Sequence, residues 1–302
     1  MLINKYLADL LQLEIEDKKQ SRNFKYVKEL PSYKPARIVL NEIYNSIKPI
    51  DKDFIKQFQG AGFDSRIWEL YLAASFNELG FEIAREHDKP DFELQKGDTK
   101  IFVEAVTSNP SFNDEIDDKI SALQKLPKGK IVESLLELRN ESTVKLASAL
   151  LSKLRKKYWD KKWVSNHPII LAIEPFHHSL AQMFSDSNII GFLYGFDNDW
   201  WYDENGKLKI STFPIDTHPK GEKTIPSNFF NYAECENISA VIFSNSGTIS
   251  KFGRIGVQKG YGKDELMMVR TGTINDPDPN AAYPISVKYI VGDGKYEEKW
   301  VD

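Results

Sequence analysis

Apolar side chains recur every three or four residues in several stretches of the chain, which predicts amphipathic helices there. The predicted helices cover residues 2–20, 38–47, 66–79 and 144–158. The third has the clearest ends, since Asp64 or Ser65 can cap its first turn and Gly80 follows its last apolar position. Because the first two predicted helices precede residue 60, we expect the N-terminal part of the chain to form a helical region.

Between the third and fourth predicted helices, short segments rich in apolar and β-branched residues predict strands. These strands cover residues 81–84, 91–95 and 100–107, and a fourth strand is predicted after the last helix, over residues 169–173. The sequence Lys96-Gly97-Asp98 is typical of a tight turn and predicts a hairpin. Residues 109–140 contain turn signals at Pro110, Pro127 and Gly129 and are expected to form an insertion. Residues 65–174 thus give the order α-β-β-β-α-β.

The last third of the chain reads as strands and turns. Its predicted strands cover residues 200–202, 208–210, 238–243 (an interior strand), 249–257, 266–270 and 284–291. Asn205-Gly206 between the first two predicts another hairpin. We expect an α/β (α+β) fold whose mixed sheet is flanked by helices. Its expected parts are a helical region 1–60, a core 61–175 with an insertion at 109–140, and a mainly β region 176–302 that could pack on the same core.

Charge and cysteine content narrow the class of protein. Forty basic and forty-four acidic residues give a net charge of −4, which excludes a uniformly basic nucleic-acid coat. The single cysteine, Cys235, cannot form an internal disulfide or a thiolate zinc cage. Asp9 and Glu14 interrupt the first apolar stretch, and the longest apolar run, 189–196, is too short to cross a bilayer. We expect a soluble cytoplasmic protein without a membrane partner.

Three acidic residues stand in apolar surroundings. Glu69 shares a helix face with apolar residues, and Asp91 begins a strand directly after Pro90. Glu104 lies in the middle of an otherwise apolar strand. Because a buried, unpaired carboxylate is costly, convergence on one divalent cation would explain all three.

Each of these acids also has a structural alternative. Asp91 could be a turn residue at the entrance to its strand, and Glu104 could face water on an edge strand. Glu69 could form an ion pair with Arg66, one turn earlier on the same helix. The sequence leaves these alternatives open.

Pro90-Asp91, then a spacer of twelve residues, then Glu104-Ala105-Val106 resembles the PD-(D/E)XK signature of the restriction-endonuclease-like nuclease superfamily. Glu69 is similar to the extra helix glutamate of many branches, and the α-β-β-β-α-β order is that of the superfamily core. The resemblance covers roughly residues 65–174. It implies a phosphodiesterase that uses Mg²⁺ or Mn²⁺, in which Asp91 and Glu104 hold the ion and Glu69 binds it directly or through water.

The chain departs from this signature at one position, because Val106 stands where the motif has lysine. Lys100 points to the same side of the strand as Glu104 but lies about 13 Å along it, too far to substitute. Some branches of the superfamily carry the lysine on the following helix. There, Lys153 borders the apolar face and is expected to reach inward as a catalytic residue, whereas Lys156 faces solvent.

Residues 145–162 hold seven basic residues and one acidic residue, a local charge of +6 that we expect on one helix. A phosphate backbone could lie there, although a solvated helix face is the alternative. A second basic set surrounds residues 251–254. The residues expected to bind nucleic acid are Lys145, Lys156, Lys157, Lys161, Lys251 and Arg254.

These observations favour a magnesium-dependent nuclease, most readily one that acts on DNA in defence or in a mobile element. The first alternative is a nuclease-fold protein that has lost catalysis with the motif lysine and binds nucleic acid or a protein. A third hypothesis is a protein-interaction module whose acids are structural. Enzymes of this superfamily are often dimers, so a homodimer stays open. No GxGxxG, Walker, GxSxG or HExxH motif occurs, so dinucleotide, ATP, serine-hydrolase and zincin chemistry lack their signatures.

Overall fold

A computed structural model gives a mixed α/β protein with a five-stranded mixed sheet flanked by helices, helices in its N-terminal part and small β-hairpins towards the C-terminus. The structure describes residues 9–47, 51–84, 86–109, 123–178, 180–184, 187–220, 223–262, 266–274 and 285–292. The chain divides into two compact units: residues 1–70 with 248–302, and residues 71–247. The three-part division expected from the sequence stays a prediction. Within the described ranges, no helix is both long and apolar enough to span a membrane.

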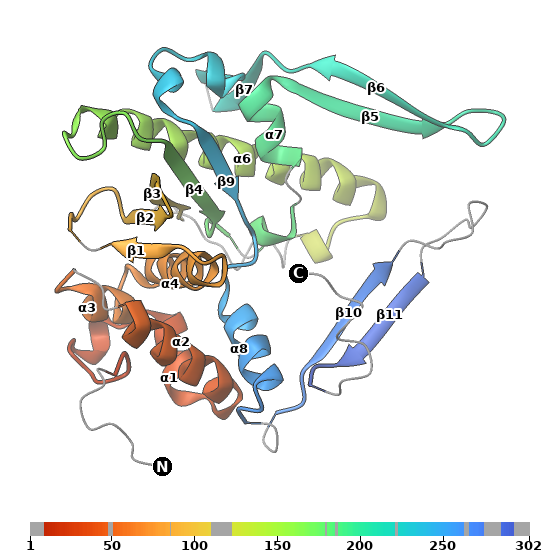
Figure 1. The fold of residues 1–302 in the computed structure, drawn as a ribbon. Helices are drawn as coiled ribbons and strands as arrows, with labels where there is room; N and C mark the ends of the chain where they lie inside the picture. The colour runs from red at the N-terminus through yellow and green to blue at the C-terminus, as the bar shows by residue number, and fades with distance from the viewer. Residues whose placement is uncertain are drawn as a thin grey trace. The chain divides into compact units, whose positions relative to one another are not determined.

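The first unit is mainly helical (Figure 1). Its N-terminal helices are α1 (Arg22–Glu29), α2 (Lys34–Ile47), α3 (Phe54–Gln59) and the first half of α4 (Phe63–Glu78). The predicted helices 38–47 and 66–79 are confirmed. The prediction of a helix over 2–20 is wrong for its described part, where residues 9–20 contain only a 3-10 turn.

Side chains from later in the chain explain that error. The Gln59 amide donates to the carbonyl oxygens of Leu10 and Gln12 at 3.1 and 2.7 Å, and its oxygen accepts from the Glu14 backbone N–H at 2.9 Å. Asn41 accepts from the Leu10 N–H at 2.9 Å. These bonds satisfy the backbone groups that a helix would otherwise pair, so the extended path is stable.

The C-terminal part of the first unit holds α8 (Ile249–Gln258) and a hairpin of β10 (Val269–Ile274) and β11 (Ile285–Ile290). The last two predicted strands are confirmed with shifted bounds, but the strand predicted over 249–257 is wrong. Its buried residues, Phe252, Gly256 and Val257, follow helical spacing, and the Thr248 side chain caps the Lys251 N–H.

The second unit is built on a sheet of order β1-β2-β3-β4-β9. The strands are β1 (Glu82–Ala84), β2 (Phe92–Lys96), β3 (Thr99–Ser108), β4 (Ile169–Pro175) and β9 (Ala240–Phe243). The first three pair antiparallel, and the last three pair parallel. Gly97 turns the predicted hairpin with φ of 57°, a conformation that only glycine adopts freely. The elements that the structure describes between residues 63 and 175 follow the predicted order α-β-β-β-α-β.

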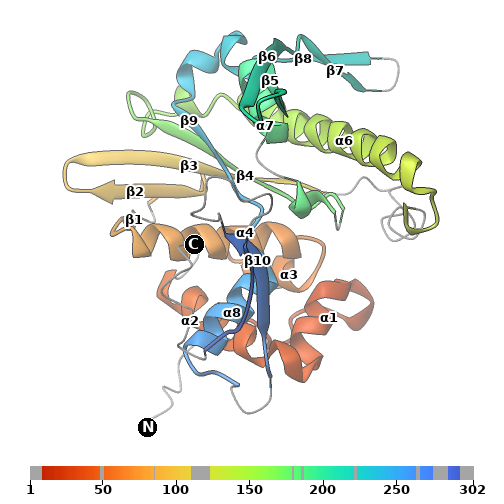
Figure 2. The same cartoon turned by 90° about the vertical axis from the view of Figure 1, so that its right-hand side faces the viewer.

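One face of this sheet is covered by α6 (Lys128–Leu154) (Figure 2). Phe102 and Val106 of β3 share a core with Leu146 and Leu150 of α6. On the opposite face, Phe76 of α4 packs edge-on against Phe92, with ring centroids 5.4 Å apart. Two apolar layers therefore enclose the middle of β3.

The helix α6 begins within the segment predicted as an insertion. Pro127 is its N-cap residue, and Gly129 lies in its first turn, where neither residue interrupts a helical hydrogen bond. The two turn signals thus mark the start of a helix that spans residues 128–140 of this segment, and its role as an insertion into the core stays a prediction. Residues 110–122 lie outside the described part of the chain.

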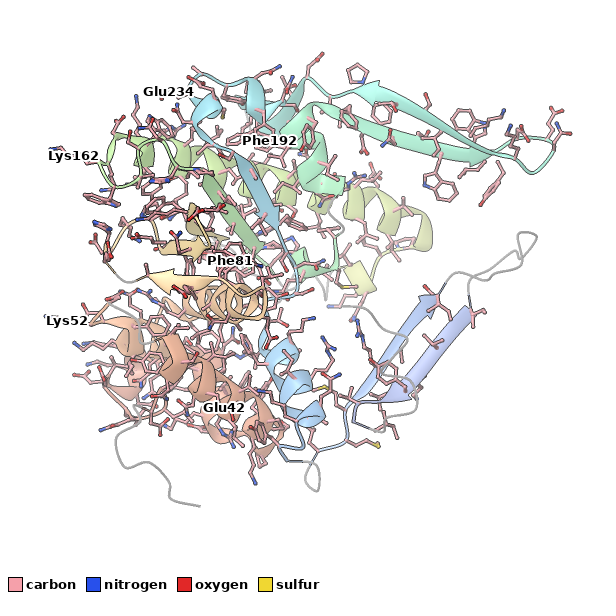
Figure 3. All side chains as sticks on the ribbon, in the orientation of Figure 1. Glu42, Lys52, Phe81, Lys162, Phe192 and Glu234 are labelled. Atoms are coloured by element: carbon pink, nitrogen blue, oxygen red, sulfur yellow. The ribbon has the colours of Figure 1, made fainter. Side chains whose placement is uncertain are left out.

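The rest of the second unit is α7 (Ser187–Tyr194) and two hairpins, β5 (Phe196–Tyr202) with β6 (Leu208–Pro214) and β7 (Thr217–Lys220) with β8 (Lys223–Pro226). The hairpin predicted at Asn205-Gly206 is confirmed. Phe192 of α7 is completely buried in the core of this unit (Figure 3). Among the described strands, β9 lies at the edge of the sheet beside β4, so the prediction of an interior strand is wrong.

Candidate active site

Glu104 is a charged residue in the middle of the core layer under α6. It alternates along β3 with Phe102 and Val106, so all three point to the α6 face of the sheet. Its side chain is 0% exposed. The sheet register pairs Phe92 with Val103, which brings Asp91 opposite Glu104 on the same face. Two of the three acids predicted as metal ligands are therefore neighbours.

Backbone and side-chain contacts fix Asp91 at the entrance to β2. Its Oδ2 accepts a hydrogen bond from the Ala105 backbone N–H at 2.9 Å, and its Oδ1 accepts one from Lys89 Nζ at 2.6 Å. The Asp91 side chain is 12% exposed, and that of Lys89 is 48% exposed. Asp91 thus ties the start of β2 to the interior of β3 beside Glu104.

Two groups from the α6 side hold the Glu104 carboxylate. Lys153 Nζ lies 2.5 Å from Glu104 Oε1, and the Tyr158 hydroxyl donates to the same oxygen at 2.6 Å. Burial and the nearby Asp91 charge raise the pKa of the Glu104 carboxyl, while Lys153 opposes that shift. Burial, followed by the Glu104 charge, raises the pKa of the Tyr158 phenol, so this hydroxyl stays a donor.

The second oxygen of Glu104 differs from the first. Within the described residues, Glu104 Oε2 is buried and has no hydrogen-bond partner. A carboxylate oxygen in an apolar layer is costly unless a donor or a cation meets it. Among the described residues of the second unit, this buried oxygen without a partner points most directly to a bound group.

Glu93 of β2, on the α6 face of the sheet, belongs to a second acidic cluster. Glu86, His87 and Glu93 each place one ligand atom within 4.8 Å of the others. His87 Nδ1 lies 3.1 Å from Glu93, and Lys100 forms an ion pair with the other Glu93 oxygen. Burial raises the pKa of the Glu93 carboxyl. Lys100 and His87 together lower this pKa by more than burial raises it, so the net shift is downward. Sequence reasoning missed this group, although Glu93 is two residues from Asp91 and thus on the same strand face.

Aromatic packing closes one side of this region. The His87 ring stacks on Trp163 with centroids 4.4 Å apart, and Lys161 Nζ lies 5.0 Å from the centre of the Trp163 ring. Trp163 Nε1 donates to the Lys89 carbonyl oxygen at 2.9 Å. These contacts hold the segment that carries Lys89 and Asp91 against the chain that follows α6.

Glu69 lies in the first unit, on α4. Arg66 Nη1 donates to Glu69 Oε2 at 2.7 Å, and the Glu69 side chain is 18% exposed. Arg66 also forms an ion pair with Asp51. The alternative partner expected from the sequence is therefore present, and a metal-binding role for Glu69 stays a prediction.

The residues expected to bind nucleic acid fall in both units. The +6 segment is not one helix, because α6 ends at Leu154 and Lys157 takes a left-handed φ of 47°. Lys145 lies on α6, while Lys156, Lys157 and Lys161 follow it, and Lys157 forms an ion pair with Glu234. Lys162, next to Lys161, is exposed at the surface of the second unit (Figure 3).

The other two expected residues, Lys251 and Arg254, lie on α8 of the first unit. Lys251 is half-buried and Arg254 is 9% exposed. They lie on a helix where the sequence predicts a strand, and contact with nucleic acid stays a prediction for all six residues.

Comparisons of the chain with protein-family models, with curated proteins and with solved structures find no match. The resemblance to the PD-(D/E)XK superfamily therefore depends on this chain's own residues and on the order of its elements.

Proposed function

We propose that the chain is a metal-dependent nuclease with a restriction-endonuclease-like core, and that Asp91 and Glu104 form its reactive centre. The observation that carries the proposal is the Glu104 carboxylate, which is completely buried opposite Asp91, with Oε2 facing no donor within the described residues. A carboxylate with a purely structural role would gain by pairing both oxygens.

The residues fit the cation that the superfamily resemblance implies. Asp91 and Glu104 offer oxygen donors, which Mg²⁺ and Mn²⁺ prefer, and the buried Oε2 gives such an ion a ligand. These two residues would hold it. When bound, the cation supplies an activated water and neutralises charge on the phosphate.

The surrounding side chains have separable tasks. Lys153 stabilises the ionised form of Glu104, so in this proposal it is a positioning residue. Tyr158 fixes the carboxylate through Oε1 and leaves Oε2 available. The Ala105 N–H and Lys89 orient Asp91. Lys153 on α6 thus stands in for the lysine that Val106 replaces.

The charge around the centre supports a phosphodiester substrate. Lys89 and Lys161 belong to the segments that border Asp91, and exposed lysines continue beyond α6. Contacts of this kind neutralise phosphates without reading sequence. We propose DNA as the substrate, with RNA as the arm of the assay that tests this choice.

The test is cleavage of plasmid DNA and of RNA with Mg²⁺, Mn²⁺ or EDTA. The native chain is expected to cut DNA with either metal and not with EDTA. Asp91→Asn and Glu104→Gln are expected to lower the rate by at least about 100-fold, the upper range for disturbing a metal site. Asp98→Asn, in the exposed hairpin turn, is the matched control. Cleavage that survives both site variants would refute this centre.

One observation favours a second candidate, a nuclease-fold protein that binds nucleic acid without cutting it. Val106 is 1% exposed and packs in the core, so the motif position holds no cation. Lys153, moreover, is already paired with Glu104. Absence of cleavage under every condition, together with salt-dependent binding of DNA in a gel-shift assay, supports this candidate over the first.

A further inference from the structure

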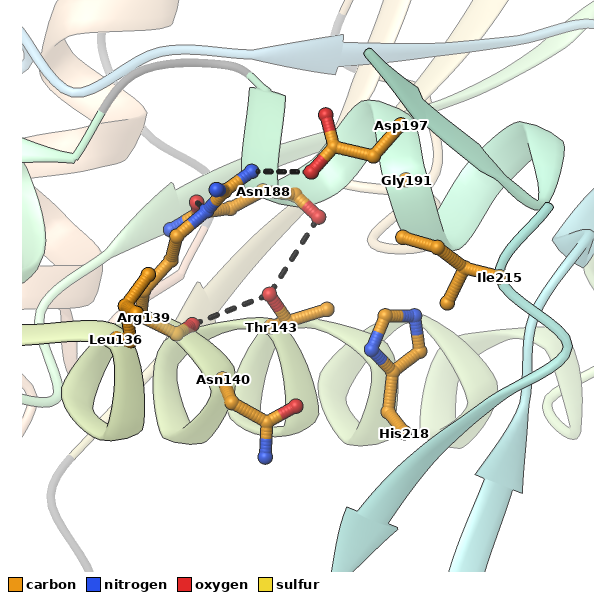
Figure 4. A pocket seen from close by; sticks show the side chains of 9 residues that line it. All are labelled: Leu136, Arg139, Asn140, Thr143, Asn188, Gly191, Asp197, Ile215 and His218. Atoms are coloured by element: carbon orange, nitrogen blue, oxygen red, sulfur yellow. Dashed lines mark hydrogen bonds and ion pairs between the residues drawn. The ribbon is translucent and has the colours of Figure 1, made fainter. Parts of the chain in front are cut away.

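A pocket elsewhere in the second unit has a polar lining that the proposed centre does not use. It measures about 180 Å³ and lies between α6, α7, β5 and β7 (Figure 4). Its lining residue Thr143 is ten residues from Lys153, roughly 15 Å along α6. The pocket is thus separate from Asp91 and Glu104.

Arg139 fixes the orientation of one lining side chain. Its Nε donates to Asn188 Oδ1 at 2.7 Å, and its Nη2 donates to Asp197 Oδ2 at 2.8 Å (Figure 4). Because a guanidinium can only donate, the Asn188 oxygen must face Arg139 and its Nδ2 must be the remaining donor. Asn188 is 4% exposed, and Nδ2 has no partner among the described residues.

His218 adds a second buried polar atom. Its ring points from β7 into the pocket, between Thr143 and Ile215 (Figure 4). His218 is 7% exposed, and within the described ranges its Nε2 has no hydrogen-bond partner. Burial lowers the pKa of this imidazole, which is therefore neutral at pH 7. The neutral ring can offer Nε2 as an acceptor or as a donor.

Charge and size restrict what these atoms can bind. Arg139 and Asp197 neutralise each other, and His218 is uncharged. The pocket therefore has no net charge that would attract an anion or a cation. Leu136, Gly191 and Ile215 supply an apolar wall. A cavity of about 150 Å³ holds one benzene molecule. A single ring therefore fits the pocket.

We propose that this pocket binds a neutral single-ring cyclic amide, the chemistry of a pyrimidine base such as uracil. A ring carbonyl would accept from Asn188 Nδ2, and the adjacent ring N–H or a second carbonyl would pair with His218 Nε2. The ring itself would lie against the apolar wall. The free base and an unpaired base in a single strand share this chemistry. The pocket and its test are independent of nuclease activity.

Gly191 permits a test that preserves the fold. A Cβ at this position would meet Ile215 Cδ1 at 3.5 Å and the Phe196 carbonyl oxygen at 3.6 Å, both ordinary contacts. Gly191→Ala therefore fills part of the pocket without a clash and improves the propensity of α7. Gly129→Ala on α6, with nothing within 4 Å of its Cβ, is the matched control.

The experiment is calorimetric titration of the full chain with uracil. We expect saturable binding that weakens roughly tenfold in Gly191→Ala and in His218→Phe, while Gly129→Ala binds as the native chain does. Benzene and inorganic phosphate are expected to bind at least about tenfold more weakly than uracil. Thermal unfolding midpoints of both glycine variants should equal or exceed the native one.

Competition distinguishes the two sources of the ligand. Displacement of uracil by oligo(dT) but not by an abasic strand assigns the pocket to an unpaired base, whereas no displacement by either assigns it to the free base. The absence of saturable uracil binding up to its solubility limit would overturn the proposal. Binding that is equal in the native chain, Gly191→Ala and His218→Phe would overturn it as well.

Discussion

Replacing Lys153 by methionine separates the charge of this residue from its packing. The substitution keeps an unbranched side chain against the apolar face of α6 but removes the cation 2.5 Å from Glu104 Oε1. Breaking a buried ion pair by removing one partner costs about 3–5 kcal/mol in free energy of unfolding. The Lys153 side chain is 28% exposed, so water screens one end of the pair and the low end of this range applies, about 3 kcal/mol.

If the ion pair supports Glu104, the loss in free energy of unfolding caused by Lys153→Met depends on the charge of Glu104. In a Glu104→Gln background the lysine meets only a neutral amide, and its removal is expected to cost about 1 kcal/mol or less. The difference, about 2 kcal/mol, is the coupling energy of the pair. Urea unfolding of the four chains at pH 7 measures it. Equal costs in both backgrounds would refute the ion pair as the support of Glu104.

The difference in free energy of unfolding between the native chain and Lys153→Met is expected to change with pH in one direction. Burial and Asp91 raise the pKa of Glu104 above its unfolded value, and Lys153 limits the rise, so Lys153→Met raises this pKa further. An acid whose pKa is raised in the folded state contributes stability that is present below its unfolded pKa, about 4.3, and lost as pH rises through the folded value. The stability deficit of Lys153→Met relative to the native chain is therefore expected to shrink as the pH falls from 8 to 4. A deficit that is constant or grows over this range contradicts the account.

Three further predictions concern single side chains of the second unit. Tyr158→Phe removes the hydrogen bond from the phenol to the Glu104 carboxyl group and is expected to lower the free energy of unfolding by about 1–2 kcal/mol at pH 7; a urea midpoint equal to the native one refutes this. Phe192→Ala empties a fully buried ring site and should cost about 3–5 kcal/mol by the same measurement, whereas a loss below about 1 kcal/mol places Phe192 outside the core. Gly97→Val forces a β-branched residue to φ of 57° and should lower the thermal midpoint, while Asp98→Asn in the same turn leaves it unchanged.

Local patterns predicted much of the candidate site. Turn signals at Gly97 and helical spacing around Val144 were enough to give α-β-β-β-α-β, because those contacts are close in sequence. The parity of Glu104 on its strand and the position of Lys153 at the edge of an apolar helix face placed the two side chains toward each other. Both inferences use only the periods of strand and helix.

Other features depend on contacts between distant residues. Gln59 pairs the backbone of residues 10–14 across more than forty positions, and no local pattern indicates this. The strand predicted at 249–257 contains Gly256 at a buried helix position, where α8 approaches Pro35 within a distance that only glycine permits. The polar pocket joins α6, α7 and β7 and has no signal within any one segment.

Binding of Mn²⁺ tests the proposed centre most directly, because it depends on the ligands and not on the identity of the substrate. Titration of the full chain, followed by electron paramagnetic resonance of free Mn²⁺, is expected to show a site that Asp91→Asn and Glu104→Gln each weaken by at least about tenfold. Glu86→Gln, in the neighbouring group of Glu86, His87 and Glu93, is expected to leave that affinity unchanged. Mn²⁺ binding that is lost in Glu86→Gln and retained in Asp91→Asn would place the ion on the neighbouring group and contradict the account.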